Sequence, residues 1–196
     1  WQKRETLLGR ARDILTGVRR NNLVGDEWLD NGQRAVETAL GVLCEGKEML
    51  DLLYPFNIQF DFVFSHSVGV ALYAAVLARE CGFVSPMAQF QIAAGALLHD
   101  IGKMEFPRDL LLKDPKKLNL GEVRILETHC KRATDRLQKM SPMTKDVLMI
   151  VHQHHEAING TGFPDHAKKA QIHPLARVLY VANEYANWVL EGPASS

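Results

Sequence analysis

Two pairs of adjacent residues that can bind metal ions stand where apolar helical segments end. His99 and Asp100 follow the apolar run IAAGALL, and His154 and His155 follow a second helical segment. Adjacent helical residues point about 100° apart, so both members of a pair can face one pocket only at a helix end. There an imidazole and a carboxylate can share one cation, while the second carboxylate oxygen bridges to another. With two further histidines, the candidate ligands are His66, His99, Asp100, His129, His154 and His155.

This ligand set predicts a catalytic metal site rather than a structural one. Imidazole and carboxylate without thiolate suit iron or manganese, with zinc or nickel as alternatives. Two-metal sites space their ions about 3.5–4 Å apart. His66 lies one residue before its predicted helix and His129 lies inside another, so either one taken alone would be interpreted as an ordinary polar or core histidine. His152, His166 and His173 are interpreted as ordinary polar histidines.

The composition fits one domain without net charge. The chain has 196 residues, 46% of them apolar, which is enough to build a core. Acidic and basic residues balance at 23 each, so no overall charge attracts nucleic acid or an anionic membrane. The first twenty residues are locally basic, but they lack interleaved aromatic residues for base stacking. We therefore interpret them as a solvated helix face and expect no nucleic-acid polymer as a partner.

The cysteines and the apolar runs indicate a cytoplasmic protein. Cys44, Cys81 and Cys130 show no C-x-x-C spacing, which argues against disulfides and thiolate zinc sites. The longest apolar stretch, residues 68–78, is shorter than the roughly 18 residues of a membrane span, so no membrane partner is expected. Because the chain begins with Trp1 rather than Met, we expect an upstream sensor domain. Protein signalling partners are expected as the alternative to such a domain.

Apolar residues recur at helical spacing along nearly the whole chain, and the alternation of half-buried strands is absent. We therefore predict an all-α fold, a helical bundle of about seven helices with the metal site in its core. Residues 1–57 are expected to form a helical extension and residues 58–196 the functional domain. The approximate predicted helices are Thr6–Arg19, Glu27–Leu53, Ser67–Cys81, Ser85–His99, Asn119–Lys139, Ser141–Glu156 and Pro174–Leu190.

Local signals mark several of these boundaries. Ser85 supplies a capping hydroxyl before Pro86 at the first helical position. Asn119 with Glu122 has the spacing of a capping box. The glycine-rich segment NGTGFP, residues 159–164, is predicted to be a loop.

At these residues the sequence resembles the HD superfamily of metal-dependent phosphohydrolases, and more closely its HD-GYP subfamily of cyclic di-GMP phosphodiesterases. The resemblance covers about residues 66–186, roughly six-tenths of the chain. It is carried by HSVGVALYAAVLA, ALLHDIGKMEFP, LETH, HQHHEAINGTGFP and IHPLARVLYVANEYA. The order and context of these motifs match the subfamily, whereas an HD pair alone would be a weak signal.

The resemblance implies roles for the candidate ligands. His66, His99 and Asp100 would hold one metal ion, and Asp100 would bridge to a second. His129 and His154 would complete the second site. His155 would line the site, or bind a third ion in trinuclear members. Lys103 would face the substrate phosphate, and the substrate-binding GYP signature corresponds to Gly162, Phe163 and Pro164.

The chain departs from the family pattern at four places. Asn183 stands where the family has its last metal-binding aspartate, and a neutral amide oxygen is a weaker ligand. Phe62 replaces the glutamate of trinuclear members, so we expect two divalent ions rather than three. Phe163 lacks the hydroxyl of the signature tyrosine, and the downstream Arg and Lys that grip substrate phosphates have no counterpart in ANWVLEGPASS.

The expected function is therefore hydrolysis of cyclic di-GMP by a metal-bridging hydroxide, with Asp100 and Lys103 as the catalytic residues. Lys103 would offset charge on the phosphorane as the ribose oxygen departs. The alternative is a catalytically degenerate module that binds a ligand or a partner protein, which Asn183 and Phe163 favour. A nucleotide phosphohydrolase of the wider superfamily is disfavoured by the NGTGFP segment.

Overall fold

The computed structural model of the chain describes residues 62–140 and 144–190. The predicted helices Thr6–Arg19 and Glu27–Leu53 lie outside these residues, as does the predicted extension 1–57 with its boundary. The described α-helices are α5 (Phe62–Glu80), α6 (Pro86–Leu98), α7 (Arg108–Leu111), α8 (Leu120–Glu127), α9 (His129–Met140), α10 (Lys145–Gln153) and α11 (Pro174–Leu190). Three short 3₁₀ helices join them, namely η1 (Ile101–Glu105), η2 (Pro115–Lys117) and η3 (Lys169–Gln171).

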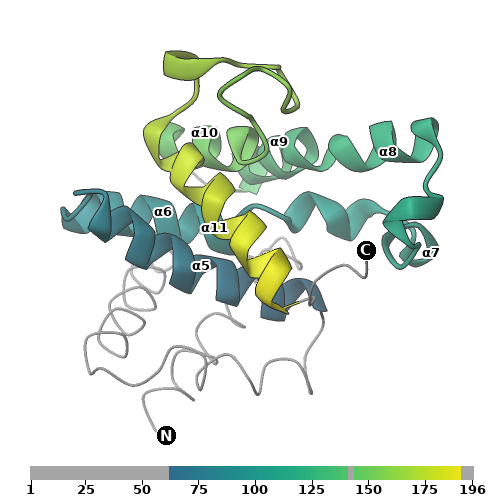
Figure 1. Cartoon of the computed structure of the whole chain (residues 1–196), viewed down its shortest axis with the longest axis horizontal. Helices are drawn as coiled ribbons and strands as arrows, with labels where there is room; N and C mark the ends of the chain where they lie inside the picture. Colours follow the sequence, from purple (N-terminus) through teal and green to yellow (C-terminus); the bar gives the residue numbers. More distant parts are fainter. Residues whose placement is uncertain (1–61, 141–143, 191–196) are drawn as a thin grey trace, which may run out of the picture.

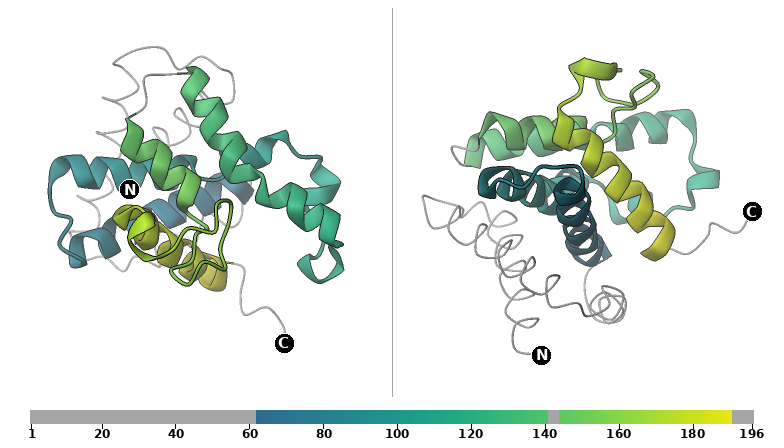
Figure 2. Two further views of the ribbon diagram at one scale, coloured as in Figure 1. Left: turned by 90° about the horizontal axis from the view of Figure 1, so that it is seen from above. Right: turned by 60° about the vertical axis from the view of Figure 1, so that its left-hand side comes forward.

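The helices form a bundle around one apolar core. Helix α5 packs against α6 and α11, α10 packs against α6, α9 and α11, and η1 packs against α9. Figure 1 shows α11 crossing α5, while α8 and α9 run along the opposite side of the molecule. The two further views in Figure 2 show the same crossing from above and from the side. The largest fully buried apolar side chains include Leu72, Ile92, Leu98, Ile150 and Leu179.

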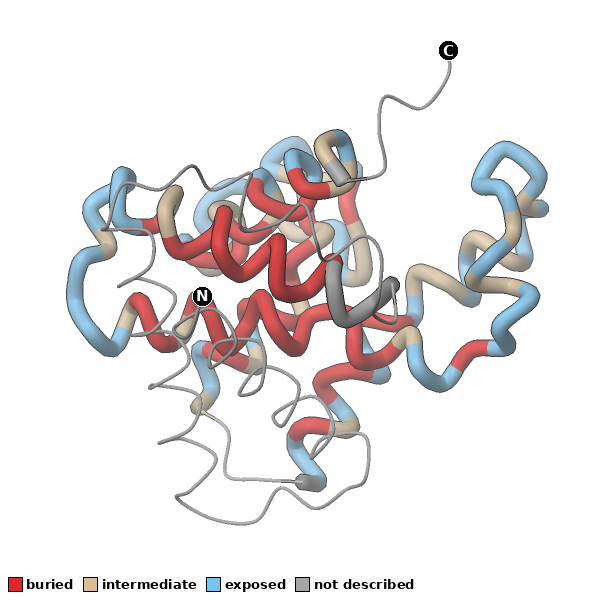
Figure 3. Tube along the Cα trace, turned by 90° about the horizontal axis from the view of Figure 1, so that it is seen from below, coloured by how far each residue is buried: buried red, intermediate tan, exposed pale blue. Residues whose placement is uncertain are grey.

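Burial is uneven along this bundle. Figure 3 shows buried residues along much of the helical bundle and exposed residues around α7 and η2. Among the described residues the β-structure is limited to one isolated antiparallel bridge between Asn159 and Lys168. The predicted all-α class is therefore confirmed. None of the described helices combines the length and the apolarity needed to cross a membrane.

Three of the predicted helix starts are confirmed. The Ser85 hydroxyl accepts a hydrogen bond from the backbone of the third residue of α6, and Pro86 begins that helix. Asn119 and Glu122 form a reciprocal capping box at the start of α8. Helix α11 begins at Pro174 and ends at Leu190, as its apolar pattern predicts.

The predicted helix from Asn119 to Lys139 is wrong in one respect, because it is two helices. The Thr128 hydroxyl donates a hydrogen bond to the carbonyl of Ile125, and the Thr128 backbone N–H donates a second one to the same carbonyl. This tight final turn ends α8, and α9 begins at His129. His129 therefore starts a helix instead of lying inside one, which places its side chain at a helix end like those of the two histidine pairs.

Two other boundaries differ from the prediction. Helix α5 begins at Phe62 rather than Ser67, so the helix also includes the segment FVFSH that precedes Ser67. Helix α10 begins at Lys145, where the Thr144 hydroxyl caps it, and the predicted start at Ser141 lies outside the described residues. The short α7 was not predicted.

Candidate metal centre

Helix ends bring most of the predicted ligands together. His99 is the C-terminal cap of α6, and the next residue, Asp100, is the N-terminal cap of η1. His154 is the C-terminal cap of α10, and His129 is the first residue of α9. His66 is the exception, because it lies inside α5 and not one residue before it as predicted. All five side chains are buried.

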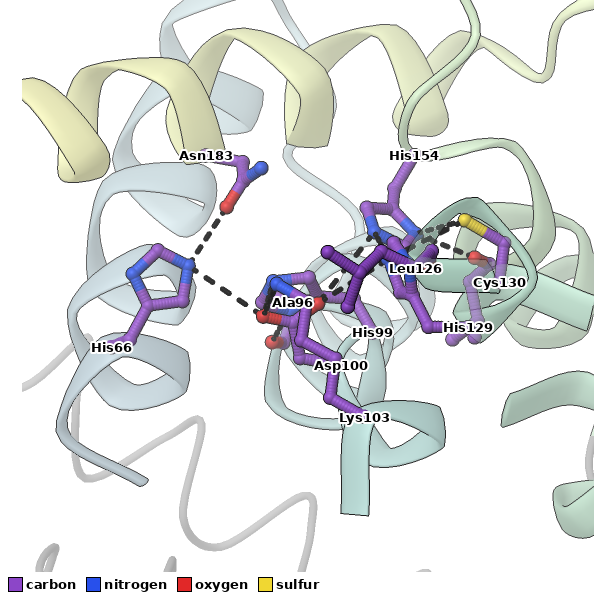
Figure 4. A network of polar contacts seen from close by, with 11 residues as sticks. His66, Ala96, His99, Asp100, Lys103, Leu126, His129, Cys130, His154 and Asn183 are labelled. Carbon is purple, nitrogen blue, oxygen red and sulfur yellow. Dashed lines mark hydrogen bonds and ion pairs between the residues drawn. The ribbon is translucent and has the colours of Figure 1, made fainter. Parts of the chain in front are cut away.

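Asp100 is shared by two clusters of candidate ligands. In each cluster the ligand atoms lie within 4.8 Å of one another. Figure 4 shows His66 on one side of Asp100 and His129 with His154 on the other. The first cluster is His66, His99 and Asp100, and the second is Asp100, His129, His154 and His155. The structure thus assembles all six predicted histidine and aspartate residues at one centre.

The two oxygens of Asp100 face different clusters. Its Oδ2 lies 3.3 Å from His99 Nε2 and 3.9 Å from His66 Nε2. Its Oδ1 lies 3.5 Å from His129 Nε2 and 4.0 Å from His154 Nε2. A carboxylate in this position can bridge two cations, one for each oxygen.

Three of the imidazoles are oriented by their own helices. Nδ1 of His99, His129 and His154 lies 2.7, 2.7 and 2.6 Å, respectively, from the backbone carbonyl three residues earlier. Because a carbonyl only accepts, Nδ1 of the neutral ring carries the proton, and the Nε2 lone pair is left facing the centre. The Nε2 atoms of His129 and His154 consequently face each other at 3.2 Å.

Burial sets the protonation of the cluster. It is the largest cause that lowers the pKa of His66 and of His129 to about 4 and that of His155 to about 3. Burial also lowers the pKa of His154 well below its usual value. Burial alone would raise the pKa of Asp100, but the electrostatic effects of the nearby His99 and Lys103 side chains outweigh it and hold that pKa well below its usual value. Neutral imidazoles beside an ionised carboxylate are the protonation states that bind cations.

Asn183, rather than the neighbouring Glu184, faces the cluster. Its amide oxygen Oδ1 lies 2.9 Å from His66 Nε2 (Figure 4). The Asn183 side chain is buried, whereas Glu184 is exposed. Helix α11 thus carries Asn183 to the position that the family alignment predicts. Its role as a ligand stays a prediction.

Lys103 and a pocket adjoin the centre. Lys103 Nζ lies 2.7 Å from Asp100 Oδ2, and its side chain remains 31% exposed. Lys103 and Asp100 line a pocket of about 620 Å³, whose other side is formed by residues 110–115, by Leu118 and by residues of α8. Apolar residues of that side include Leu110, Leu111 and Leu118. The pocket therefore joins a polar centre to an apolar wall beside α7.

The predicted NGTGFP loop covers the second cluster. The Phe163 ring stacks on the His155 ring with centroids 4.6 Å apart, and Phe163 lines the pocket. Gly162 is packed so closely that a Cβ atom would meet the backbone of His155 and Ala157. Gly162 and Pro164 are absent from the described pocket lining, so their predicted contact with substrate stays a prediction.

Sequence reasoning missed the carboxylate that fixes this loop. Glu156 is 2% exposed, and its two oxygens accept hydrogen bonds from the backbone N–H groups of Asp165 (2.6 Å) and Ala167 (2.9 Å). An acidic residue between a histidine pair and a glycine-rich segment was the available signal. Glu156 therefore holds the loop, and it belongs to neither of the two ligand clusters.

The other described histidines and cysteines, namely His152, His166, His173, Cys81 and Cys130, lie outside the two clusters. His152 Nε2 lies 2.8 Å from Asp165 Oδ2, and His173 Nε2 lies 3.6 Å from Asp146 Oδ1. Cys130 is near the chemistry, as predicted, with its Sγ 3.5 Å from His129 Nε2. Burial raises the pKa of the Cys130 thiol, which keeps it neutral and a poor ligand.

Comparisons with known proteins agree with this geometry. A cyclic di-GMP phosphodiesterase of Pseudomonas aeruginosa is 34% identical over 149 residues, which are 76% of this chain and 35% of that protein. A 3'3'-cGAMP-specific phosphodiesterase of Vibrio cholerae is 31% identical over 137 residues, which are 70% of this chain and 29% of that protein. This chain thus spans about a third of the length of these relatives.

The fold and the family are also shown. A solved structure, an HDG"Y"P protein from Bdellovibrio bacteriovorus, superposes with a TM-score of 0.77 at 20% identity. The superposition covers 96% of this chain and 59% of the Bdellovibrio chain. The HD domain family model matches residues 55–194, which include both clusters and Asn183. The predicted resemblance is confirmed, and this chain belongs to the HD domain family.

Proposed function

We propose that this chain is a metal-dependent phosphodiesterase that hydrolyses a cyclic dinucleotide, with cyclic di-GMP as the first candidate. The observation that carries the proposal is the position of Asp100, whose two oxygens face two separate histidine clusters beside an open pocket. The relatives support the substrate class, since their names specify cyclic di-GMP or 3'3'-cGAMP. Both compounds contain guanine and two phosphodiester linkages.

The residues present fit a pair of divalent cations. His99 Nε2 and Asp100 Oδ1 are buried and have no hydrogen-bond partner among the described residues. The facing Nε2 atoms of His129 and His154 likewise bring two lone pairs together, an arrangement that a cation between them would satisfy. Imidazole-rich sites suit iron or manganese better than magnesium, which prefers oxygen ligands and retains water.

Each group would have a distinct part in hydrolysis. Divalent cations, when bound, supply Lewis acidity and lower the pKa of water toward neutrality. Asp100 would fix the spacing between the clusters, and the carbonyl-bound Nδ1 atoms would hold three imidazoles in place. Lys103 would place its ammonium beside the phosphate and offset the charge that develops on it. The products would be a linear dinucleotide or GMP.

Chromatography of the nucleotide products tests this proposal. Protein loaded with manganese or ferrous iron should convert cyclic di-GMP, whereas protein with magnesium alone should have little activity. Asp100→Asn should abolish the conversion, because a neutral amide has one oxygen and cannot bridge two cations as a carboxylate can. Absence of product from fully metallated protein over a long incubation would exclude the phosphodiesterase.

Asn183 favours a second candidate, a non-catalytic module that binds a cyclic dinucleotide or a partner protein. Its amide next to His66 supplies no negative charge to the first cluster. Binding of cyclic di-GMP by metallated protein without any turnover would support this candidate over the enzyme.

A further inference from the structure

Two lysines line the pocket beside Asp100, and each is held by a carboxylate. Lys103 comes from η1 and contacts Asp100 at 2.7 Å. Lys113 lies between α7 and η2, in the segment that forms the opposite, largely apolar side of the pocket. Figure 1 shows α7 lying apart from α10 and α11, close to the start of α8. The pocket therefore offers a second positive charge from a separate element.

Lys113 is fixed in position by Glu122. Its Nζ lies 2.7 Å from both carboxylate oxygens of Glu122. Glu122 is in turn held by the capping box, because its Oε2 accepts the backbone N–H of Asn119 at 2.9 Å. A lysine held at both oxygens of an anchored carboxylate loses less side-chain entropy when it binds a ligand.

The Lys113 ammonium still has a hydrogen bond to give. An ammonium group carries three donors, and the two oxygens of Glu122 take two of them. Within the part of the chain that the structure describes, its side chain contacts no other acceptor. Its side chain is 35% exposed, and it lines the pocket, so the third N–H can reach a ligand there.

A cyclic dinucleotide needs two cationic contacts that lie apart from each other. Its two phosphates stand on opposite sides of the ring, so only one of them can lie at the centre around Asp100. We propose that Lys113 binds the second phosphate, and this inference rests on the proposed function. Leu110, Leu111 and Leu118 line the same wall, where they would contact ribose and base and exclude water. Exclusion of water strengthens a contact between ammonium and phosphate.

Lys117 provides a matched control on the same segment. Its side chain is 76% exposed, it lies 4.0 Å from Asp114, and it is absent from the pocket lining. Lys117→Met therefore removes the same charge from the same part of the molecule without touching the pocket. Lys113→Arg restores the charge at the site and serves as the conservative variant.

The test measures equilibrium binding and turnover on metallated protein. The ligand is the slowly hydrolysed phosphorothioate analogue of cyclic di-GMP, so binding is read independently of activity. Lys113→Met should weaken binding about 10–100-fold, the range for a lost charged hydrogen bond. Lys117→Met should leave binding unchanged, and Lys113→Arg should restore most of it. Turnover of bis(p-nitrophenyl) phosphate, which has a single phosphodiester, should be the same in all variants.

The outcomes separate this inference from the proposed function. If Lys113→Met binds the analogue as wild type does, or if Lys117→Met weakens binding equally, Lys113 does not hold the second phosphate. That result leaves the phosphodiesterase intact when wild type still hydrolyses cyclic di-GMP. Conversely, binding that depends on Lys113 but leads to no hydrolysis supports this inference and contradicts the proposed phosphodiesterase activity. Wild type that hydrolyses bis(p-nitrophenyl) phosphate but binds no cyclic dinucleotide overturns the role of Lys113.

Discussion

His66 Nε2 lies 2.9 Å from the amide oxygen of Asn183, so the nitrogen directed at the first cluster contacts a neutral group. The contact joins α5 to α11 across 117 positions of sequence, and both side chains are buried. Both clusters share the carboxylate of Asp100, but the second has three imidazoles, whereas the first has two imidazoles and the neutral amide of Asn183 beside them. We therefore expect the first cluster to bind its ion more weakly than the second.

Asn183→Asp should strengthen the first site. A carboxylate at this position adds charge compensation, and changes of this kind alter metal affinity about 10–100-fold. The same carboxylate is buried in the metal-free protein, so that form should become less stable. Metal titration followed by calorimetry measures the affinity, and thermal unfolding in chelator measures the stability.

Glu184→Asp is the control for this substitution, because Glu184 is exposed on the same helix. It should change neither metal affinity nor stability. If Asn183→Asp also leaves both quantities unchanged, Asn183 does not contact the ion.

Metal content should depend on Asp100 more than on any one histidine. Elemental analysis of wild type should give two ions per chain, in keeping with its two clusters. Asp100→Ala removes a ligand from both clusters and should lower the content of both ions, whereas His66→Ala or His155→Ala should affect mainly one. Equal metal content in Asp100→Ala and wild type would contradict the bridging role.

Much of the fold could be predicted from local signals. The caps at Ser85 and Asn119 and the whole of α11 depend on residues close in sequence, and the structure has them as predicted. The break at Thr128 was missed because the apolar spacing continues through it, while one hydroxyl hydrogen bond ends the helix. The start of α5 was placed five residues too late, although its first residues, FVF, are apolar as well.

The site was predictable only in part. The paired residues at helix ends indicated a shared centre, and the family pattern pointed to Asn183. The division of Asp100 between two clusters depends on how α5, α9 and α10 pack, so it was predicted by the family resemblance and by no local pattern. Glu156 and Lys113 were missed for the same reason, since their partners lie in loops or helices several residues away.

Gly102→Ala should destabilise the protein. Gly102 is the second residue of η1, and a Cβ atom there would meet the backbone of His129 and Ala133 in α9. Backbone cannot move aside as a side chain can, so we expect a loss of about 1–3 kcal/mol in unfolding free energy. Chemical denaturation measures it. Gly121→Ala, whose added methyl would meet only the Asn119 side chain, should have a much smaller effect.

The metal-free protein should lose stability as the pH falls below about 6.5. Burial lowers the pKa of His66 and His129 to about 4 and of His155 to about 3, whereas the unfolded chain keeps the usual value of 6.5. Between these values the unfolded state binds more protons, so acid favours it. Each histidine contributes up to about 1.4 kcal/mol per pH unit in this window.

Denaturation of chelator-treated protein at several pH values between 8 and 5 measures this slope. His155→Gln removes one titrating group and should give a shallower dependence than wild type. A free energy of unfolding that stays constant from pH 7 to pH 5 would contradict the burial of these neutral imidazoles.

Glu156→Gln should loosen the loop that carries Phe163. The two carboxylate oxygens of Glu156 accept the N–H groups of Asp165 and Ala167, and a glutamine offers only one oxygen. Its NH₂ group would then face a second donor, so one buried hydrogen bond is lost at a cost of about 1–3 kcal/mol. Hydrogen exchange should become faster at the N–H groups of Asp165 and Ala167, while exchange in the core of α6 should change little.

Asp165→Asn separates this anchor from the surface contact of the same loop. The Asp165 side chain is 60% exposed and pairs with His152, whereas its backbone N–H bonds to Glu156 independently of that pair. An exposed pair contributes about 0–1 kcal/mol, so exchange in the loop should stay close to wild type. If Asp165→Asn loosens the loop as much as Glu156→Gln does, the surface pair holds the loop. The buried carboxylate would then have no special part in placing Phe163 over His155.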